Sequence, residues 1–162
     1  MNRRTALMLT GMVLIGLATF TFPQHGFAQS SPLIGTWKLN LDKSKYIPGP
    51  PPRSGTLNYT QDGQNTRNSS QGIDAQGNPT AIVFMHVYDG QPHPTTGSPI
   101  FDSSAYSRLD ANTFIFTRLK AGKLVGVGTA VVSQDGKTWT VTQTGADASG
   151  RPANSIAVYD KQ

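Results

Sequence analysis

The chain contains no cysteine and no glutamate, and only 14% of its 162 residues are charged. The absence of cysteine excludes a disulfide-stapled scaffold, a thiolate metal site and a cysteine nucleophile. Because glutamate is also absent, all nine acidic residues are aspartates, and carboxylate acid–base chemistry would depend on those nine positions alone. The chain has instead 17 glycines and 11 prolines, residues that mark turns between short elements.

The amino-terminal segment, residues 1–28, has the pattern of an export signal. Arg3 and Arg4 give a positive start, residues 5–22 are apolar and uncharged, and small residues precede a cleavage point after Ala28. We therefore expect one domain, residues 29–162, in the periplasm or outside the cell. An uncleaved anchor is the alternative, because the apolar stretch 5–22 is just long enough to span a bilayer. Sec export and twin-arginine export both remain open.

Turn signals recur along residues 29–162, and six of the nine aspartates lie in them. Glycine and asparagine supply positive φ there, and aspartate closes the turn through its side chain. The stretches between the turns are rich in Thr, Val, Ile, Tyr and Phe and lack helical periodicity. We predict an all-β, antiparallel up-and-down meander of eight to ten strands, closed as a barrel because closure removes edge strands. A sandwich or a twisted open sheet is the alternative. The predicted strands cover 35–41, 54–61, 65–73, 79–88, 103–109, 113–119, 124–133, 138–145 and 152–160.

Charge and surface pattern exclude two classes of protein. Loss of residues 1–28 removes two arginines and lowers the net charge from +5 to +3. The remaining basic residues are scattered and not clustered, so a nucleic-acid partner is not expected. The expected outward face is rich in threonine and has no paired aromatic girdles, which is unlike an integral outer-membrane barrel.

Two proline-rich stretches interrupt the strand pattern. Residues 46–53 include three consecutive prolines, which favour a stiff extended loop. We interpret this loop as a strap across one barrel end, with a lid or a docking segment as the alternative. Residues 91–101 contain three further prolines and cannot donate a full ladder of hydrogen bonds. Both stretches are candidates for a barrel mouth.

The register of the strands decides which side chains face inward. A two-residue turn at Asp135-Gly136 sets Val132 opposite Trp139. Extending this register gives a preferred core face with Leu109, Ile115, Leu119, Leu124, Ala130, Val132, Trp139, Val141, Ile156 and Val158. The opposite face carries Tyr106, Arg108, Phe114, Phe116, Arg118, Ala157, Tyr159 and the threonines of 138–144, and we expect it to meet solvent.

A slip of one residue would invert this assignment. The aromatic and cationic face would then line a cavity suited to an amphiphile with an acid head. The candidate ligand-binding residues are Tyr106, Arg108, Phe114, Phe116, Arg118 and Tyr159.

Two histidines are the candidates for a metal site. A two-residue turn at Asp89-Gly90 would set His86 opposite His93, with Cβ atoms about 5 Å apart. Asp102 or water would complete the shell of a transition metal, and the same three side chains would serve an enzyme at the barrel mouth. The alternative is that His86 is a buried strand residue and His93 a loop residue. No nucleophile elbow or phosphate loop occurs, and no cofactor is expected.

Three segments carry resemblances to known proteins. Residues 33–39 resemble the Gly-x-Trp first strand of lipocalins and of cytosolic fatty-acid-binding proteins, and residues 157–161 are similar to the closing strand of the latter. The whole chain looks still more like small exported bacterial proteins of unknown function, a resemblance that implies no activity. It is carried by 35–40, 44–46 with 48–50, 88–90, 96–99 and 135–138.

The sequence departs from the fatty-acid-binding pattern at two places. Ala157 stands where that family has the arginine of an Arg-x-Tyr pair that holds a ligand carboxylate, although Tyr159 remains. The proline loop stands where that family has two short helices. The resemblance therefore implies the barrel and not the ligand chemistry. Trp37 is expected to close a barrel end by its burial.

These observations lead to one expectation of function and one alternative. We expect an exported, non-enzymatic, lipocalin-like protein that binds a small apolar or amphiphilic ligand. The alternative is an envelope interaction or structural module whose barrel is filled by its own side chains.

Overall fold

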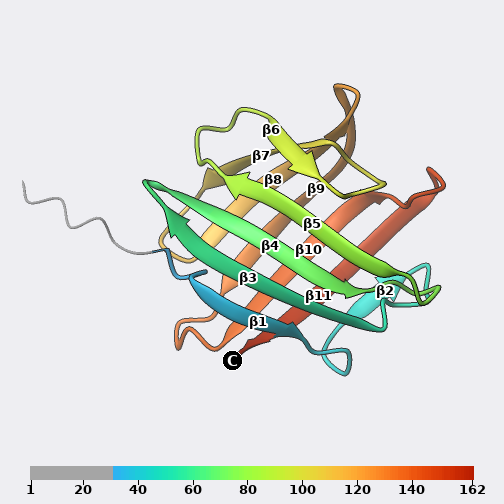
Figure 1. The fold of residues 1–162 in the computed structure, drawn as a ribbon, viewed down its shortest axis with the longest axis horizontal. Coiled ribbons are helices and arrows are strands. Elements are labelled where there is room, and N and C mark those ends of the chain that lie inside the picture. Colours follow the sequence, from blue (N-terminus) through green and yellow to red (C-terminus); the bar gives the residue numbers. More distant parts are fainter. Residues whose placement is uncertain (1–30) are drawn as a thin grey trace, which may run out of the picture.

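The computed structural model describes residues 31–162, which form eleven strands and no helix (Figure 1). None of these residues forms a helix able to cross a membrane. The predicted export signal lies outside the described residues. The strands are β1 (Gly35–Leu39), β2 (Lys45–Ile47), β3 (Ser54–Asp62), β4 (Asn65–Ile73), β5 (Pro79–His86), β6 (His93–Thr96), β7 (Ser103–Arg108), β8 (Thr113–Lys120), β9 (Lys123–Val132), β10 (Thr138–Ala146) and β11 (Pro152–Lys161).

Ten of the strands form a closed antiparallel barrel. The order runs from β1 through β3 to β11 without a crossover, and β1 pairs with β11, with Trp37 opposite Lys161. In Figure 1, β3 to β5 form the front wall and β8 to β11 the back wall. The predicted all-β up-and-down barrel is confirmed.

The eleventh strand, β2, continues the wall where β1 leaves it. β1 pairs with the last residues of β11, whereas β2 pairs with earlier ones, with Tyr46 opposite Ser155. Residues 40–44 loop out between the two strands, and the Val158 N–H donates to Ser44 Oγ at 2.9 Å. Neither β2 nor β6 was predicted, because prolines lie within or beside both stretches and obscure their strand pattern.

β8 turns its aromatic residues into the barrel, so the preferred face assignment for this strand was wrong. The two-residue turn forms as expected, with Ala121 at φ 48°. A β-bulge between Arg118 and Leu119 then shifts the register by one residue, and Phe116 lies opposite Gly128. One extra residue inverts every side chain beyond it. Four side chains assigned to the core are exposed instead: Leu109, Ile115, Leu124 and Ile156.

The inward and outward faces of β11 are also exchanged relative to the prediction. Five residues separate the paired ends Ala146 and Pro152, and this odd number sets Tyr159 opposite Trp139 on the inner face. The predicted pairing of Val132 with Trp139 is confirmed. The residues that face inward against the preferred assignment are Tyr106, Phe114, Phe116, Arg118, Ala157 and Tyr159.

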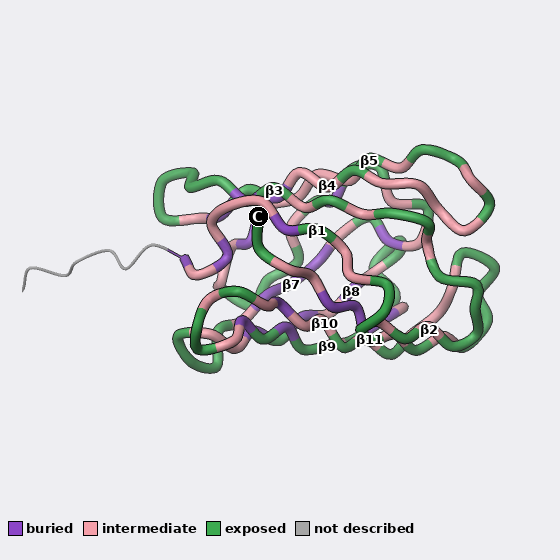
Figure 2. The backbone as a smooth tube through the Cα atoms, turned by 90° about the horizontal axis from the view of Figure 1, so that it is seen from below, coloured by how far each residue is buried: buried purple, intermediate pink, exposed green. Residues whose placement is uncertain are grey.

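The interior differs between the two ends of the barrel, while buried and exposed positions alternate along the strands (Figure 2). We call the end with the turns after β3, β5, β7 and β9 the closed end, because large, fully or nearly fully buried side chains fill it. At the opposite, open end most of the inward residues are small and partly exposed, although the larger Tyr46 also projects inward there. The closed end contains Leu33, Trp37, Tyr59, His86, Phe114, Val132 and Trp139. The open end contains Gly55, Ser70, Gly72, Gly145, Ala153 and Ser155.

Candidate functional site

Arg118 is the one buried ionised side chain among residues 31–162. It is 9% exposed on the inner face of β8, and its Nη1 donates to Ser104 Oγ at 2.6 Å. Ser104 Oγ in turn lies 3.1 Å from Thr95 Oγ1. The ion pairs of the described residues all lie elsewhere, so no carboxylate neutralises Arg118. Burying a charge without a counter-ion is costly, and Arg118 is therefore a charge that an anion from outside would satisfy.

Four aromatic rings surround this guanidinium. Arg118 Cζ lies 4.3 Å from the ring centroid of Phe101 and 4.6 Å from that of Phe116. The corresponding distances to Phe84 and Tyr106 are 5.2 and 5.3 Å. Cation–π contacts of this kind contribute about 0.5–2 kcal/mol each, and they partly offset the burial of the charge. We call Arg118 and these four rings the Arg118 box.

Toward the open end the interior is filled less completely than at the closed end. Side chains that face inward keep part of their surface exposed, although strand walls surround them. Tyr46, which projects inward from β2, is also half-buried, and burial raises its pKa to about 12. An apolar wall with accessible surface is what a small ligand needs. The inward side chains of this kind are Leu39, Leu57, Ile82, Phe84, Val141 and Tyr159.

His86 belongs to the packed closed end. Its ring stacks on Tyr106 with centroids 4.0 Å apart and on Phe84 at 5.1 Å. Burial lowers the pKa of His86 well below its ordinary value, and the Arg118 cation lowers it further, so the imidazole is neutral. Both of its nitrogens and both amide atoms of Asn68 are buried without a hydrogen-bond partner.

The structure does not bring together the side chains predicted for a metal site or a mouth enzyme. His93 starts β6 at the closed end, where its Nε2 lies 3.0 Å from both carboxylate oxygens of Asp89. Asp102 lies at the open end and accepts a hydrogen bond from the Ala121 N–H at 2.8 Å. Within residues 31–162 no group of three or more His, Cys, Asp or Glu side chains converges on a point that could hold a metal ion.

Most of the aspartates hold turns, as their positions in the sequence predicted. Asp110 Oδ1 accepts hydrogen bonds from the backbone N–H groups of Asn112 and Thr113, both at 2.8 Å. Backbone N–H donors favour the ionised carboxylate and lower its pKa. The aspartates whose pKa is lowered chiefly in this way are Asp74, Asp89, Asp102, Asp110 and Asp147.

Five of the six candidate ligand-binding residues face the interior. Tyr106, Phe116 and Arg118 belong to the Arg118 box, Phe114 fills the closed end, and Tyr159 packs on Trp139. Arg108 is exposed at the closed end, where its Cζ lies 4.7 Å from the Tyr88 ring centroid.

Sequence reasoning missed two rings of the box, Phe84 and Phe101. Phe84 lies on β5, in the same inward phase as Ile82 and His86, but nothing in the sequence shows that this strand faces Arg118. Phe101 was hidden in the proline-rich stretch 91–101, where it is the single aromatic ring apart from His93.

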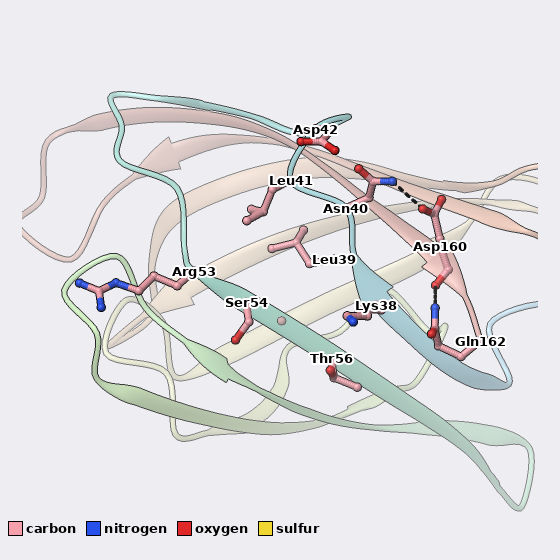
Figure 3. A pocket seen from close by; sticks show the side chains of 11 residues that line it. Lys38, Leu39, Asn40, Leu41, Asp42, Arg53, Ser54, Thr56, Asp160 and Gln162 are labelled. Carbon is pink, nitrogen blue, oxygen red and sulfur yellow. Dashed lines mark hydrogen bonds between the residues drawn. The ribbon is translucent and has the colours of Figure 1, made fainter.

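A hollow of about 430 Å³ lies where β1 and β3 part, between residues 38–42 and 53–56, and it shares Leu39 and Gly55 with the inner face of the barrel (Figure 3). Asn40 Nδ2 donates to Asp160 Oδ2 at 2.6 Å along its rim, and Lys43 pairs with the same carboxylate at 3.1 Å. The hollow mixes charges of both signs and includes none of the candidate ligand-binding residues. We therefore place the candidate site inside the barrel and not in this hollow.

No family model and no curated protein sequence matches the chain. Among solved structures, the fold is similar to that of a zebrafish ileal bile acid-binding protein complexed with cholic acid. That comparison has a TM-score of 0.48 and 12% sequence identity, and covers 82% of this chain and 100% of the other. The fold is also similar to a redesigned β-barrel, mFAP1, bound to DFHBI (TM-score 0.44, 14% identity, covering 83% and 97%). The fold is similar as well to a de novo designed fluorescence-activating β-barrel. That comparison has a TM-score of 0.42 and 10% sequence identity, and covers 80% of this chain and 93% of the other. These similarities concern the fold alone.

Proposed function

We propose that this chain is an exported, non-enzymatic binding protein whose barrel takes up a small amphiphilic anion through its open end. Arg118 is the observation that carries the proposal. It is a cation buried inside an apolar barrel, and no carboxylate of the described residues pairs with it. A ligand acid group would supply the missing counter-ion, and its apolar part would cover the exposed inner surface of Phe84, Val141 and Tyr159.

The distribution of charge also favours an anion at the open end. The connecting segments there, together with the strand residues at their ends, carry six basic and four acidic residues, whereas those at the closed end carry two basic and four acidic. A net positive rim raises the local concentration of anions and speeds their association. The six basic residues are Lys43, Lys45, Arg53, Lys120, Lys123 and Arg151.

Binding of dodecanoate and of the neutral 1-dodecanol, measured by calorimetry, tests this proposal. We expect the intact protein to bind dodecanoate at least tenfold more tightly, because a charge-assisted pair with a buried arginine is worth about 1.5–3 kcal/mol. Arg118→Gln should remove that preference. Arg67→Gln is the matched control, because Arg67 is exposed on the outer face of β4.

The proposal is overturned if neither compound binds, or if Arg118→Gln and Arg67→Gln behave alike. A barrel that binds neither compound would favour the alternative, an interaction module without a ligand.

The proposal that the protein is exported rests on the sequence pattern of residues 1–28. Amino-terminal sequencing of the protein recovered from a periplasmic or culture fraction should begin near Gln29. Recovery of the uncleaved chain from the membrane fraction would support the anchor instead.

A further inference from the structure

The Arg118 box surrounds one guanidinium with four flat aromatic rings. Resting on the proposed function, we infer that the Arg118 box accepts a planar carboxylate and rejects tetrahedral oxyanions such as sulfonate, and that Phe101 is the wall that moves to admit it.

The free hydrogen-bonding edge of Arg118 is the first argument. Nη1 is occupied by Ser104 Oγ at 2.6 Å, whereas Nε is buried and has no hydrogen-bond partner among the described residues. The five N–H groups of a guanidinium lie in one plane, and its outer edge matches the two oxygens of a carboxylate. An anion that satisfies Nε therefore lies in the plane of the guanidinium.

The rings supply the second argument. Arg118 Cζ lies over the faces of Phe101 and Phe116 at 4.3 and 4.6 Å, close to the contact distance of stacked planar groups. Phe84 and Tyr106 approach to within 5.3 Å from further directions. A carboxylate has no atoms outside its plane and fits between such faces. A sulfonate always projects at least one oxygen out of the plane, against a ring.

Phe101 differs from the other three rings because it lies on a connecting segment and not on a strand. Phe84, Tyr106 and Phe116 are fixed by β5, β7 and β8. Of the two strands that flank the segment of Phe101, β6 is held only by short ladders, with two residue pairs to β5 and two to β7. Within the segment, Ser98 Oγ accepts hydrogen bonds from the N–H groups of Ile100 and Phe101 at 3.2 and 3.3 Å, which are long for such bonds.

Both ends of this segment are firmly held. Gly97 has φ 87°, and a Cβ there would lie 1.9 Å from the Ala81 carbonyl oxygen, so no larger residue fits. At the other end, the Asp102 N–H donates to the Leu119 carbonyl at 2.9 Å, and the Asp102 carbonyl accepts from the Thr95 N–H at 2.8 Å. Movement is therefore confined to residues 98–101, and Phe101 leaves the box without disturbing the barrel wall.

Two probes with the same ring system and the same charge test the inference: 2-naphthoate and 2-naphthalenesulfonate. We expect the intact protein to bind the carboxylate at least tenfold more tightly. In Phe101→Ala the preference should fall to within about threefold, chiefly because the sulfonate binds more tightly than before. Ile100→Ala is the matched control from the same segment and should keep the tenfold preference.

The outcomes separate this inference from the proposed function. If the intact protein binds neither probe, the proposed function fails. If it binds both equally, or if Phe101→Ala keeps the full preference, the box does not select head-group shape although the barrel still binds anions. If circular dichroism shows that Phe101→Ala is unfolded, Phe101→Leu replaces it. The leucine removes one flat wall while keeping an apolar side chain, so the preference must fall at least threefold for the inference to stand.

Discussion

The two ends of this barrel are built from different side chains, although the same strands run through both. At the closed end, Trp37 and Phe114 are fully buried, and the cation of Lys161 covers Trp37 from outside at 5.1 Å. At the open end, Gly55, Gly72 and Ala153 leave the inner face bare. The first arrangement resembles a protein core and the second a binding cavity. Under the proposed function, stability and ligand access belong to opposite ends of the barrel.

The largest expected effect comes from comparing the two ends of β1. Trp37→Ala removes a fully buried ring whose Nε1 donates to the Leu33 carbonyl at 2.7 Å, and should lower the free energy of unfolding by about 3–5 kcal/mol. Leu39 lies two residues further toward the open end and is only partly buried. Leu39→Ala should therefore lower the free energy of unfolding by less than half as much as Trp37→Ala. Urea unfolding measures both. Equal losses would mean that the two ends are packed alike.

Two glycines of β9 give a smaller and sharper contrast. A Cβ on Gly128 would lie 2.3 Å from the Thr142 carbonyl oxygen and 2.4 Å from Phe116 Cζ, so Gly128→Ala should destabilise by about 1–3 kcal/mol. A Cβ on Gly126, nearer the open end, would meet nothing closer than the flexible Gln143 amide at 3.4 Å. Gly126→Ala should therefore change the unfolding midpoint little. If Gly126→Ala destabilised the protein more than Gly128→Ala does, the inner face near Gly126 would not be the more loosely packed of the two.

The smallest effect appears only when the pH changes. The pKa of His86 is lowered in the folded state, so below about pH 6.5 the unfolded chain binds a proton that the folded chain does not. Stability is therefore full above that pH and falls as the pH drops, with a slope of up to about 1.4 kcal/mol per pH unit. His86→Phe should flatten the curve between pH 7 and 5, above the range where aspartates titrate. The same slope in both proteins would show that His86 is not the source.

The fold could be predicted because its signals are local. Aspartate or glycine marks most turns, and β-branched and aromatic residues fill the strands, so the all-β barrel could be predicted from their spacing. The inner face could not be predicted in the same way. It depends on whether an odd or an even number of residues separates two paired strands, and neither the bulge after Arg118 nor the five-residue turn before Pro152 has a distinct sequence signature.

The site shows the same division between local and long-range signals. Tyr106, Phe116 and Arg118 were named as a group because β-strand spacing places them together. Phe84 and Phe101 join them only through the closure of the barrel and the path of a proline-rich segment. Contacts between residues distant in sequence are not carried by periodicity.

The bulge between Arg118 and Leu119 has a consequence for how this sequence can change over time. Deleting Val125, the extra residue of β9 opposite this step, would restore a regular ladder, turn Phe114 and Phe116 to the outside and bring Ile115 within. Substitutions in this hairpin alter one side chain each, whereas a single-codon insertion or deletion would exchange the two surfaces of the strand. The length of the hairpin is therefore constrained more tightly than its composition.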